Sequence, residues 1–163
     1  MNSYRTAYAP ILPAEYLEHF TVAEQQHDWQ DWFAADSDEI LLVAEGKAGE
    51  LAGYALGKYN PIELPPYQAE LVALHVRRDT QRQGIGLQLI NAVARALQAQ
   101  RCSSLFVWVL DANPARVFYE KIGGRYITSK PWVNNREFGE NISEVAYGWL
   151  DTLELIRITP PGR

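Results

Sequence analysis

The sequence has a single cysteine, Cys102, among its 163 residues. One cysteine excludes an internal disulfide framework and a thiolate metal cluster, and the three histidines do not show the spacing of zinc ligands. No apolar run is as long as a membrane span, and the chain does not open with the basic and apolar regions of a signal peptide. These absences predict a protein that binds no metal, does not enter a membrane and resides in the cytoplasm.

Positive charge is also scarce. Lys and Arg together number 15, against 20 Asp and Glu, which gives a net charge of −5. This balance argues against a nucleic-acid-binding surface and slightly favours a cationic substrate. Internal repeats and low-complexity segments are absent, and the length suits one domain with a core of its own. We therefore expect a single domain over residues 1–163.

The clearest secondary-structure pattern of the sequence lies between residues 70 and 100. An apolar run at 71–76 predicts a buried strand, and a helical pattern follows a polar turn with two glycines. Gly84 and Gly86 allow a ligand to approach the backbone closely. Because the first N–H groups of a helix lack intrahelical acceptors and favour negative charge, the loop is suited to phosphate. The alternative is a tight turn that simply requires glycine, and the spacing matches neither a Walker loop nor the dinucleotide fingerprint.

The rest of the chain predicts further helices and strands. Before the central stretch we expect a short helix at 14–20 and a second helix that Thr21 caps, with Glu24 completing a capping box. Residues 40–45 and 51–59 predict a hairpin around a Gly-Lys-Ala-Gly turn. The remaining predicted elements are strands at 103–110, 125–129 and 142–150, a helix at 115–122 and a polar loop at 131–139.

The segment Gln-Arg-Gln-Gly-Ile-Gly at 81–86 resembles the acyl-CoA signature of the GNAT superfamily of N-acyltransferases, Gln/Arg-x-x-Gly-x-Gly/Ala. The hairpin at 40–59 and the Asn-Pro-Ala-Arg-Val-Phe-Tyr segment at 113–119 extend the resemblance over most of the chain. It implies an α/β (α+β) fold with a mixed, mostly antiparallel central sheet flanked by helices. The stretch that resembles the family begins at Tyr4, so the first strand of the family fold is expected to be missing unless the native chain starts upstream. A second copy could cover the sheet edge that this leaves, as a homodimer.

The resemblance implies acetyl-CoA as the cofactor. Backbone N–H groups of residues 82–87 are assigned to the pyrophosphate, in agreement with the physics of a helix end. The backbone of 74–76 is assigned to the pantetheine amides and to an oxyanion donor. The predicted cofactor-binding residues are Leu74, His75, Val76, Gln81, Arg82, Gln83, Gly84, Ile85, Gly86, Leu87, Asn113, Ala115, Phe118 and Tyr119.

Two residues are the predicted catalytic groups. By resemblance, Glu70 deprotonates the amine through water, and Tyr119 gives a proton to the departing thiolate. For Glu70 the alternative is a carboxylate that faces solvent or pairs with an arginine, and for Tyr119 it is a core aromatic. His75 is a rival base, although strand alternation places it on the face opposite Leu74 and Val76. Cys102 is interpreted as an inert thiol.

The acceptor is expected to be a primary amine of a small molecule or a protein. We predict its site between the N-terminal helices and the 130–142 loop, near Trp29, Tyr67 and Trp132. An aromatic, acidic pocket there would suit a polyamine or an aminoglycoside-like cation. A catalytically silent acyl-CoA sensor or interaction module on the same fold is a competing hypothesis. An unrelated nucleotide-binding protein, whose glycine loop holds ATP or NAD, is another.

Overall fold

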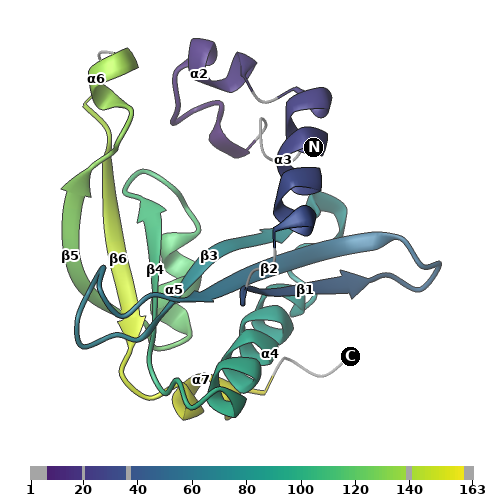
Figure 1. Ribbon diagram of the computed structural model, residues 1–163, viewed down its shortest axis with the longest axis vertical. Helices are drawn as coiled ribbons and strands as arrows, with labels where there is room; N and C mark the ends of the chain where they lie inside the picture. Colours follow the sequence, from purple (N-terminus) through teal and green to yellow (C-terminus); the bar gives the residue numbers. More distant parts are fainter. Residues whose placement is uncertain (1–6, 20, 36–37, 139–140, 160–163) are drawn as a thin grey trace.

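A six-stranded sheet organises the computed structural model, which describes residues 7–19, 21–35, 38–138 and 141–159. The strand order is β1-β2-β3-β4-β6-β5 (Figure 1). The strands are β1 Ile40–Glu45, β2 Leu51–Tyr59, β3 Ala69–Val76, β4 Leu105–Leu110, β5 Arg125–Pro131 and β6 Ser143–Trp149. The sheet is mixed and mostly antiparallel, which confirms the expected fold class.

The central pair β3 and β4 is the parallel pair of the sheet. These strands are bonded only at their starts, where Ala69 lies opposite Leu105 and Glu70 opposite Phe106. Beyond that point they diverge. Where β3 leaves β4, it also carries an extra residue, Val72, between the residues that face Gly57 and Leu56 of β2. This bulge and the divergence open the middle of the sheet.

One face of the sheet carries the main core. The helices α4 Ile85–Ala99, α5 Arg116–Lys121 and α7 Leu153–Ile156 contribute to it. In α4 the side chains of Ile90, Val93 and Leu97 are fully buried, and burial of each such side chain contributes about 1.5–3 kcal/mol. Gly57 of β2 allows this close contact, because an added Cβ would lie 2.8 Å from a methyl group of Val93.

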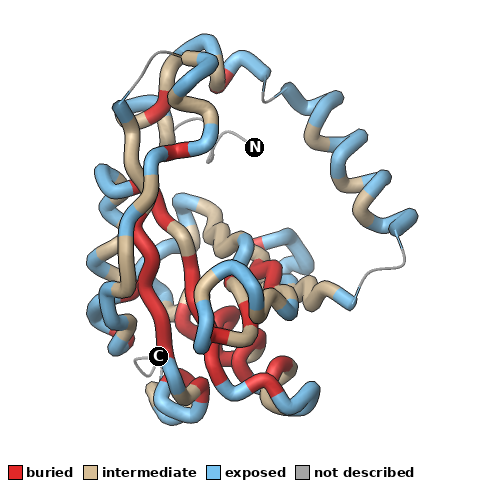
Figure 2. The backbone as a smooth tube through the Cα atoms, turned by 60° about the vertical axis from the view of Figure 1, so that its left-hand side comes forward, coloured by how far each residue is buried: buried red, intermediate tan, exposed pale blue. Residues whose placement is uncertain are grey.

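The opposite face carries a thinner layer. It is formed by α2 Ala14–Glu18, α3 Val22–Ala34 and the short α6 Asn135–Phe138, which lie above the sheet in Figure 1. A small cluster with Leu17 and Trp132 fixes α2, and the Tyr16 ring meets the Trp132 ring edge-on at 4.7 Å. No residue of α3 is buried, as its tan and blue tube shows (Figure 2).

Several sequence predictions are confirmed residue by residue. The hairpin strands have the predicted bounds, and the Thr21 hydroxyl accepts a hydrogen bond from the Glu24 N–H at 3.2 Å in a capping box. In residues 7–19, 21–35 and 38–39 no strand precedes β1. Residues 1–6, which include Tyr4, lie outside the described residues.

Other predictions need correction. The loop predicted at 131–139 contains α6, and the sequence did not predict α7; each has only four residues, too few for a periodic pattern. β4 begins at Leu105 instead of residue 103, because the residues before it bond to Gln68 through side chains. Of the described helices, none is both long and apolar enough to cross a membrane.

Candidate active site

The loop from β3 to α4 has the conformation of an anion-binding site. Arg82 and Gly84 are left-handed, with φ of 61° and 80°. The Gln88 N–H donates to the Gly84 carbonyl at 3.0 Å and closes the first turn of α4. The N–H groups of the three residues before Gln88 therefore have no acceptor within the helix, and the helix dipole favours an anion beside them.

Gly86 has space around it at this helix end. An added Cβ would lie 3.6 Å from the Phe118 ring and 3.7 Å from a Val76 methyl group, which are ordinary contact distances. Packing alone therefore does not require glycine at this position. A ligand that lies against the backbone would require it.

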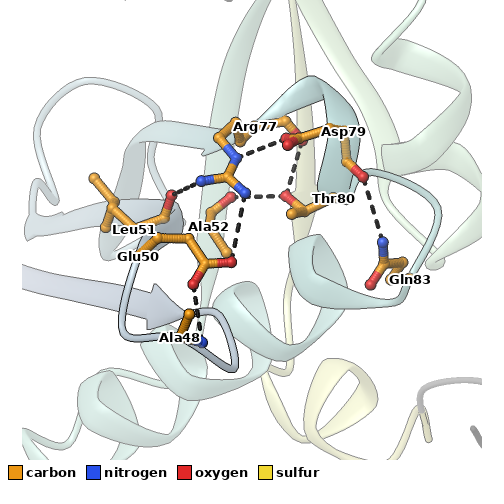
Figure 3. A network of polar contacts seen from close by, with 8 residues as sticks. All are labelled: Ala48, Glu50, Leu51, Ala52, Arg77, Asp79, Thr80 and Gln83. Atoms are coloured by element: carbon orange, nitrogen blue, oxygen red, sulfur yellow. Dashed lines mark hydrogen bonds and ion pairs between the residues drawn. The ribbon is translucent and has the colours of Figure 1, made fainter.

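Side chains of the loop tie it to the neighbouring hairpin, as Figure 3 shows. The Arg77 guanidinium donates to Asp79 at 2.6 Å and lies 3.5 Å from Glu50. The Thr80 hydroxyl lies 3.1 Å from the Ala52 carbonyl oxygen and donates toward it. These contacts hold the loop against the start of β2.

The polar side chains of the predicted signature mostly serve the loop itself. The Gln81 amide donates to the Val76 carbonyl at 3.1 Å, and the Gln83 amide reaches the Asp79 carbonyl at 3.5 Å. Arg82 is exposed. It borders, with Gln83, an open groove of about 1000 Å³ beside β1. The backbone N–H groups are thus the part of the signature that remains available to a ligand.

A cavity of about 310 Å³ lies where β3 and β4 diverge. Its walls come from both diverging strands, from the N-terminal segment and from the start of α5. The lining residues are Tyr8, Leu12, Tyr16, 71–75, 107–110, Asn113, Ala115, Tyr119, Trp132 and Glu144. The cavity therefore joins the predicted cofactor residues Leu74, His75, Asn113, Ala115 and Tyr119 to the N-terminal layer.

Tyr119 is both a core residue and a cavity residue. Its side chain is 6% exposed, and its ring lies 6.4 Å from the Trp149 ring in an edge-on contact. Burial raises the pKa of the Tyr119 phenol well above its usual value, with a smaller contribution from Tyr8. The phenol therefore keeps its proton near neutral pH and can offer a hydrogen bond to a group in the cavity.

Tyr8 was not singled out by the sequence reasoning. It lines the cavity, and the Asn113 side chain forms a hydrogen bond with its hydroxyl. The Asn113 side chain is held in place because its amide oxygen, Oδ1, accepts a hydrogen bond from the Ala115 N–H at 2.9 Å. Asn113 thus joins the start of α5 to the N-terminal segment.

The two candidate bases lie in different surroundings. Glu70 is not among the described residues that line the cavity; its carboxylate lies 3.3 Å from the Lys58 amine and accepts from the Asn60 amide at 2.8 Å. His75 lines the cavity and stacks on Tyr54 at 5.1 Å, on the face that alternation predicted. Burial lowers the pKa of His75, so its imidazole is neutral at physiological pH. The base role of Glu70 stays a prediction.

Glu144 on β6 is a cavity residue that the sequence reasoning missed. Burial raises the pKa of its carboxyl; the charges of Glu63 and Glu70 raise it further, and Lys130 opposes them. The cross-strand Lys130 amine is bound to Glu63 at 2.9 Å. A signal was available, since alternation along 142–150 places Glu144 on one face with Ala146 and Gly148.

The three predicted acceptor residues separate in the structure. Trp132 lines the cavity. Trp29 of α3 packs edge-on against Tyr54 at 5.4 Å, and Tyr67 is buried against Phe106 and Gly148. Neither of these two is among the described residues that line the cavity.

Cys102 is buried, and burial raises the pKa of its thiol, in agreement with an inert group. Among the described residues, no group of three or more His, Cys, Asp or Glu is arranged to hold a metal ion.

The geometry fits an acyl-CoA. A helix start with free N–H groups lies at the end of β3, suited to a diphosphate. The part of β3 beyond Glu70 has no strand partner on the β4 side, and it lines the cavity that ends at Tyr119. An extended amide-bearing arm can bond to such a strand edge.

Known proteins share this sequence and architecture. A model of the acetyltransferase (GNAT) family matches residues 3–124. Uncharacterized N-acetyltransferase YuaI of Bacillus subtilis (strain 168) is 32% identical, over 93% of this chain and 83% of its own length. An L-methionine sulfoximine/L-methionine sulfone acetyltransferase of Pseudomonas paraeruginosa (strain DSM 24068 / PA7) is 29% identical, over 75% of this chain and 67% of its own length.

The fold has solved counterparts as well. The crystal structure of PaiA N-acetyltransferase from Thermoplasma acidophilum, in complex with coenzyme A, has a TM-score of 0.64. The match covers 90% of this chain and 86% of that chain at 16% identity, so it shows the fold alone. The family match carries the assignment, since it spans the strands β1 to β4 and the loop before α4. The chain therefore belongs to the acetyltransferase (GNAT) family, as an N-acetyltransferase whose acetyl donor is acetyl-CoA.

Proposed function

We propose that the protein transfers an acetyl group directly from acetyl-CoA to a primary amine of a small molecule or a protein. The observation that carries this proposal is the cavity between β3 and β4. It brings the buried Tyr119 phenol, the bulged backbone at Val72 and an acceptor-side wall together in one cavity. Direct transfer requires donor and acceptor to meet in such a space.

The chain offers a separate element for each part of the donor. Free N–H groups at 82–87 suit the pyrophosphate, and the open edge of β3 suits the pantetheine amides. Ala115 lines the cavity, and the Phe118 ring of α5 lies beside Gly86. When bound, acetyl-CoA supplies an activated acetyl group and a thiolate leaving group.

The side chains then have distinct tasks. The neutral amine nitrogen of the acceptor forms a bond to the carbonyl carbon as the carbon–sulfur bond breaks. Tyr119 donates its proton to the sulfur, and a backbone N–H near Val72 stabilises negative charge on the carbonyl oxygen. The excess proton of the nitrogen leaves through water to Glu70, which lies two residues before the bulge. The phenolate regains a proton from solvent, and the products are an acetamide and the free thiol of CoA.

The test is an acceptor screen with the purified protein. Free thiol release from acetyl-CoA is followed with a panel of primary amines, for the wild type and for Tyr119→Phe. We expect release with at least one amine and a fall in kcat of about 100-fold in the variant, the usual size of a general-acid contribution. Tyr126→Phe is the control, because Tyr126 is an exposed tyrosine of β5.

Two results would count against the proposal. Binding of CoA without thiol release on any amine, unchanged by Tyr119→Phe, would indicate a silent acyl-CoA sensor. A larger thermal shift with ATP or NAD than with acetyl-CoA would indicate a nucleotide-binding protein.

A further inference from the structure

The charges that line the cavity are few. Among the described lining residues, Glu144 is the one with a carboxyl side chain, and burial keeps His75 neutral. No lysine or arginine is among these lining residues. The described part of the cavity is therefore negative on the acceptor side.

The lysines on this face of the sheet are engaged elsewhere. The Lys130 amine is bonded to Glu63 at 2.9 Å and lies 4.0 Å from the centre of the Trp108 ring. Lys58 lies 3.3 Å from Glu70. A substrate carboxylate that entered the cavity would find no lysine or arginine among the described lining residues, and it would lie near the carboxyl group of Glu144.

Aromatic rings complete the wall around Glu144. Tyr8, Tyr16 and Trp132 all line the cavity. Burial is the main cause of the raised pKa of both tyrosines, and the negative charge of Glu144 adds to it for both. The carboxylate therefore acts on both hydroxyls. A carboxylate among aromatic rings is a favourable environment for an ammonium ion.

We propose that Glu144 selects the acceptor: a small cationic amine that carries no carboxylate beside its reacting nitrogen. The inference rests on the proposed function and names the substrate class of the same site. The amine arrives as an ammonium ion that Glu144 attracts toward the rings of Tyr16 and Trp132, and it releases one proton to solvent before the neutral nitrogen reacts. A cavity of about 310 Å³, shared with the acetyl end of the donor, admits a small amine or the tip of a longer one.

This class differs from free amino acids. The Pseudomonas relative is named for L-methionine sulfoximine and L-methionine sulfone, which are amino acids. An amino acid brings a carboxylate together with its amine, and a site for it needs a cation. The lysines on this face are paired with Glu63 and Glu70. The described part of the cavity therefore offers no cation for the carboxylate of an amino acid.

The experiment compares acceptors that differ by one charge. Norleucine and norleucine amide share the amine and the side chain, and only the first has a carboxylate. We expect kcat/KM for the amide to exceed that for the acid by at least about tenfold. This comparison uses the wild-type protein and does not depend on the folding of a variant.

The variant Glu144→Gln then tests the residue. We expect it to lower kcat/KM for norleucine amide about tenfold, the effect of losing one charge-assisted contact, while KM for acetyl-CoA is unchanged. Glu154→Gln is the matched control, since Glu154 is exposed on α7. A merely structural role for Glu144 would lower the rates with all acceptors equally and would leave the ratio of amide to acid unchanged.

The outcomes separate the two proposals. Equal rates for norleucine and its amide, or an unchanged ratio in Glu144→Gln, would overturn the assignment of Glu144 and leave the acetyltransferase activity in place. No turnover of any amine would overturn the proposed function, and this inference with it.

Discussion

The loop that precedes α4 and the wall of the acceptor cavity differ in how the chain builds them. The loop consists of consecutive residues, 77–87, whose side chains bond within the loop or to the adjacent hairpin. The cavity wall is assembled from Tyr8, Trp132 and Glu144, which are far apart in sequence. A local motif can therefore indicate how the donor is held, whereas recognition of the acceptor depends on long-range packing. Variants on the two sides should affect different kinetic constants.

The largest effect is expected on the acceptor side, from Glu70→Gln. If Glu70 is the base, kcat should fall by about 100-fold, while KM for acetyl-CoA stays near the wild-type value. Glu63→Gln is the matched control, because Glu63 lies on the same face and is also paired with a lysine. Equal losses in both variants would show that the charge of this face matters and that Glu70 is not the base.

On the donor side, we expect Gly84→Ala to change KM for acetyl-CoA rather than kcat. Gly84 and Gly49 are both left-handed, with φ of 80° and 82°, so alanine should cost each site about 1–2 kcal/mol of stability. Only Gly84→Ala should raise KM for acetyl-CoA, by about tenfold, since it distorts the helix start. Gly49 has no atom within 4 Å of an added Cβ, and its variant controls for strain alone. Similar KM values in the two variants would contradict an anion site at α4.

A smaller effect is expected from the contacts in Figure 3. Arg77→Ala removes the guanidinium that joins Asp79 and Glu50. Exposed ion pairs contribute little to the stability of a protein, so the melting temperature should change little. KM for acetyl-CoA should rise about threefold, because the loop is less well fixed. Arg78→Ala, which removes the neighbouring exposed charge, should leave KM unchanged; an equal rise there would assign the effect to net charge.

The smallest effect concerns stability and pH. Because burial raises the pKa of Glu144 in the folded state, the folded protein binds more protons than the unfolded chain between the unfolded value of 4.5 and the folded pKa. Stability from this group is therefore lost as pH rises through that window. Glu144→Gln should melt at a higher temperature than wild type at pH 8, and the difference should shrink toward pH 4.

For Glu24 we expect the stability contribution to change with pH in the opposite direction. Its pKa is lowered by hydrogen bonds from the backbone and side chain of Thr21, so ionised Glu24 stabilises the fold above 4.5. Glu24→Gln should therefore melt lower than wild type at neutral pH. Scanning calorimetry of both variants from pH 4 to pH 8 measures the two trends, and trends of the same sign would contradict the surroundings assigned to Glu144.

Local chemistry explains which predictions from the sequence held. The hairpin strands and the Thr21 capping box depend on residues close in sequence, and the structure reproduces them. The point at which β3 and β4 diverge was not predicted, since no local pattern specifies where two parallel strands separate. Glu144 was missed because its position depends on β6 pairing between β4 and β5. Trp29 and Tyr67 were chosen for residue type, and packing decided their places.

The separation of β3 from β4 has a mechanical consequence. The sheet consists of two three-stranded blades, β1-β2-β3 and β4-β6-β5, which share a seam of only two residue pairs. Main-chain groups along the open part of that seam find no partner in the opposite blade. An extended molecule bonded there would act as an additional strand between the blades. Without it, the two blades are joined by these two residue pairs and by the main core that they share.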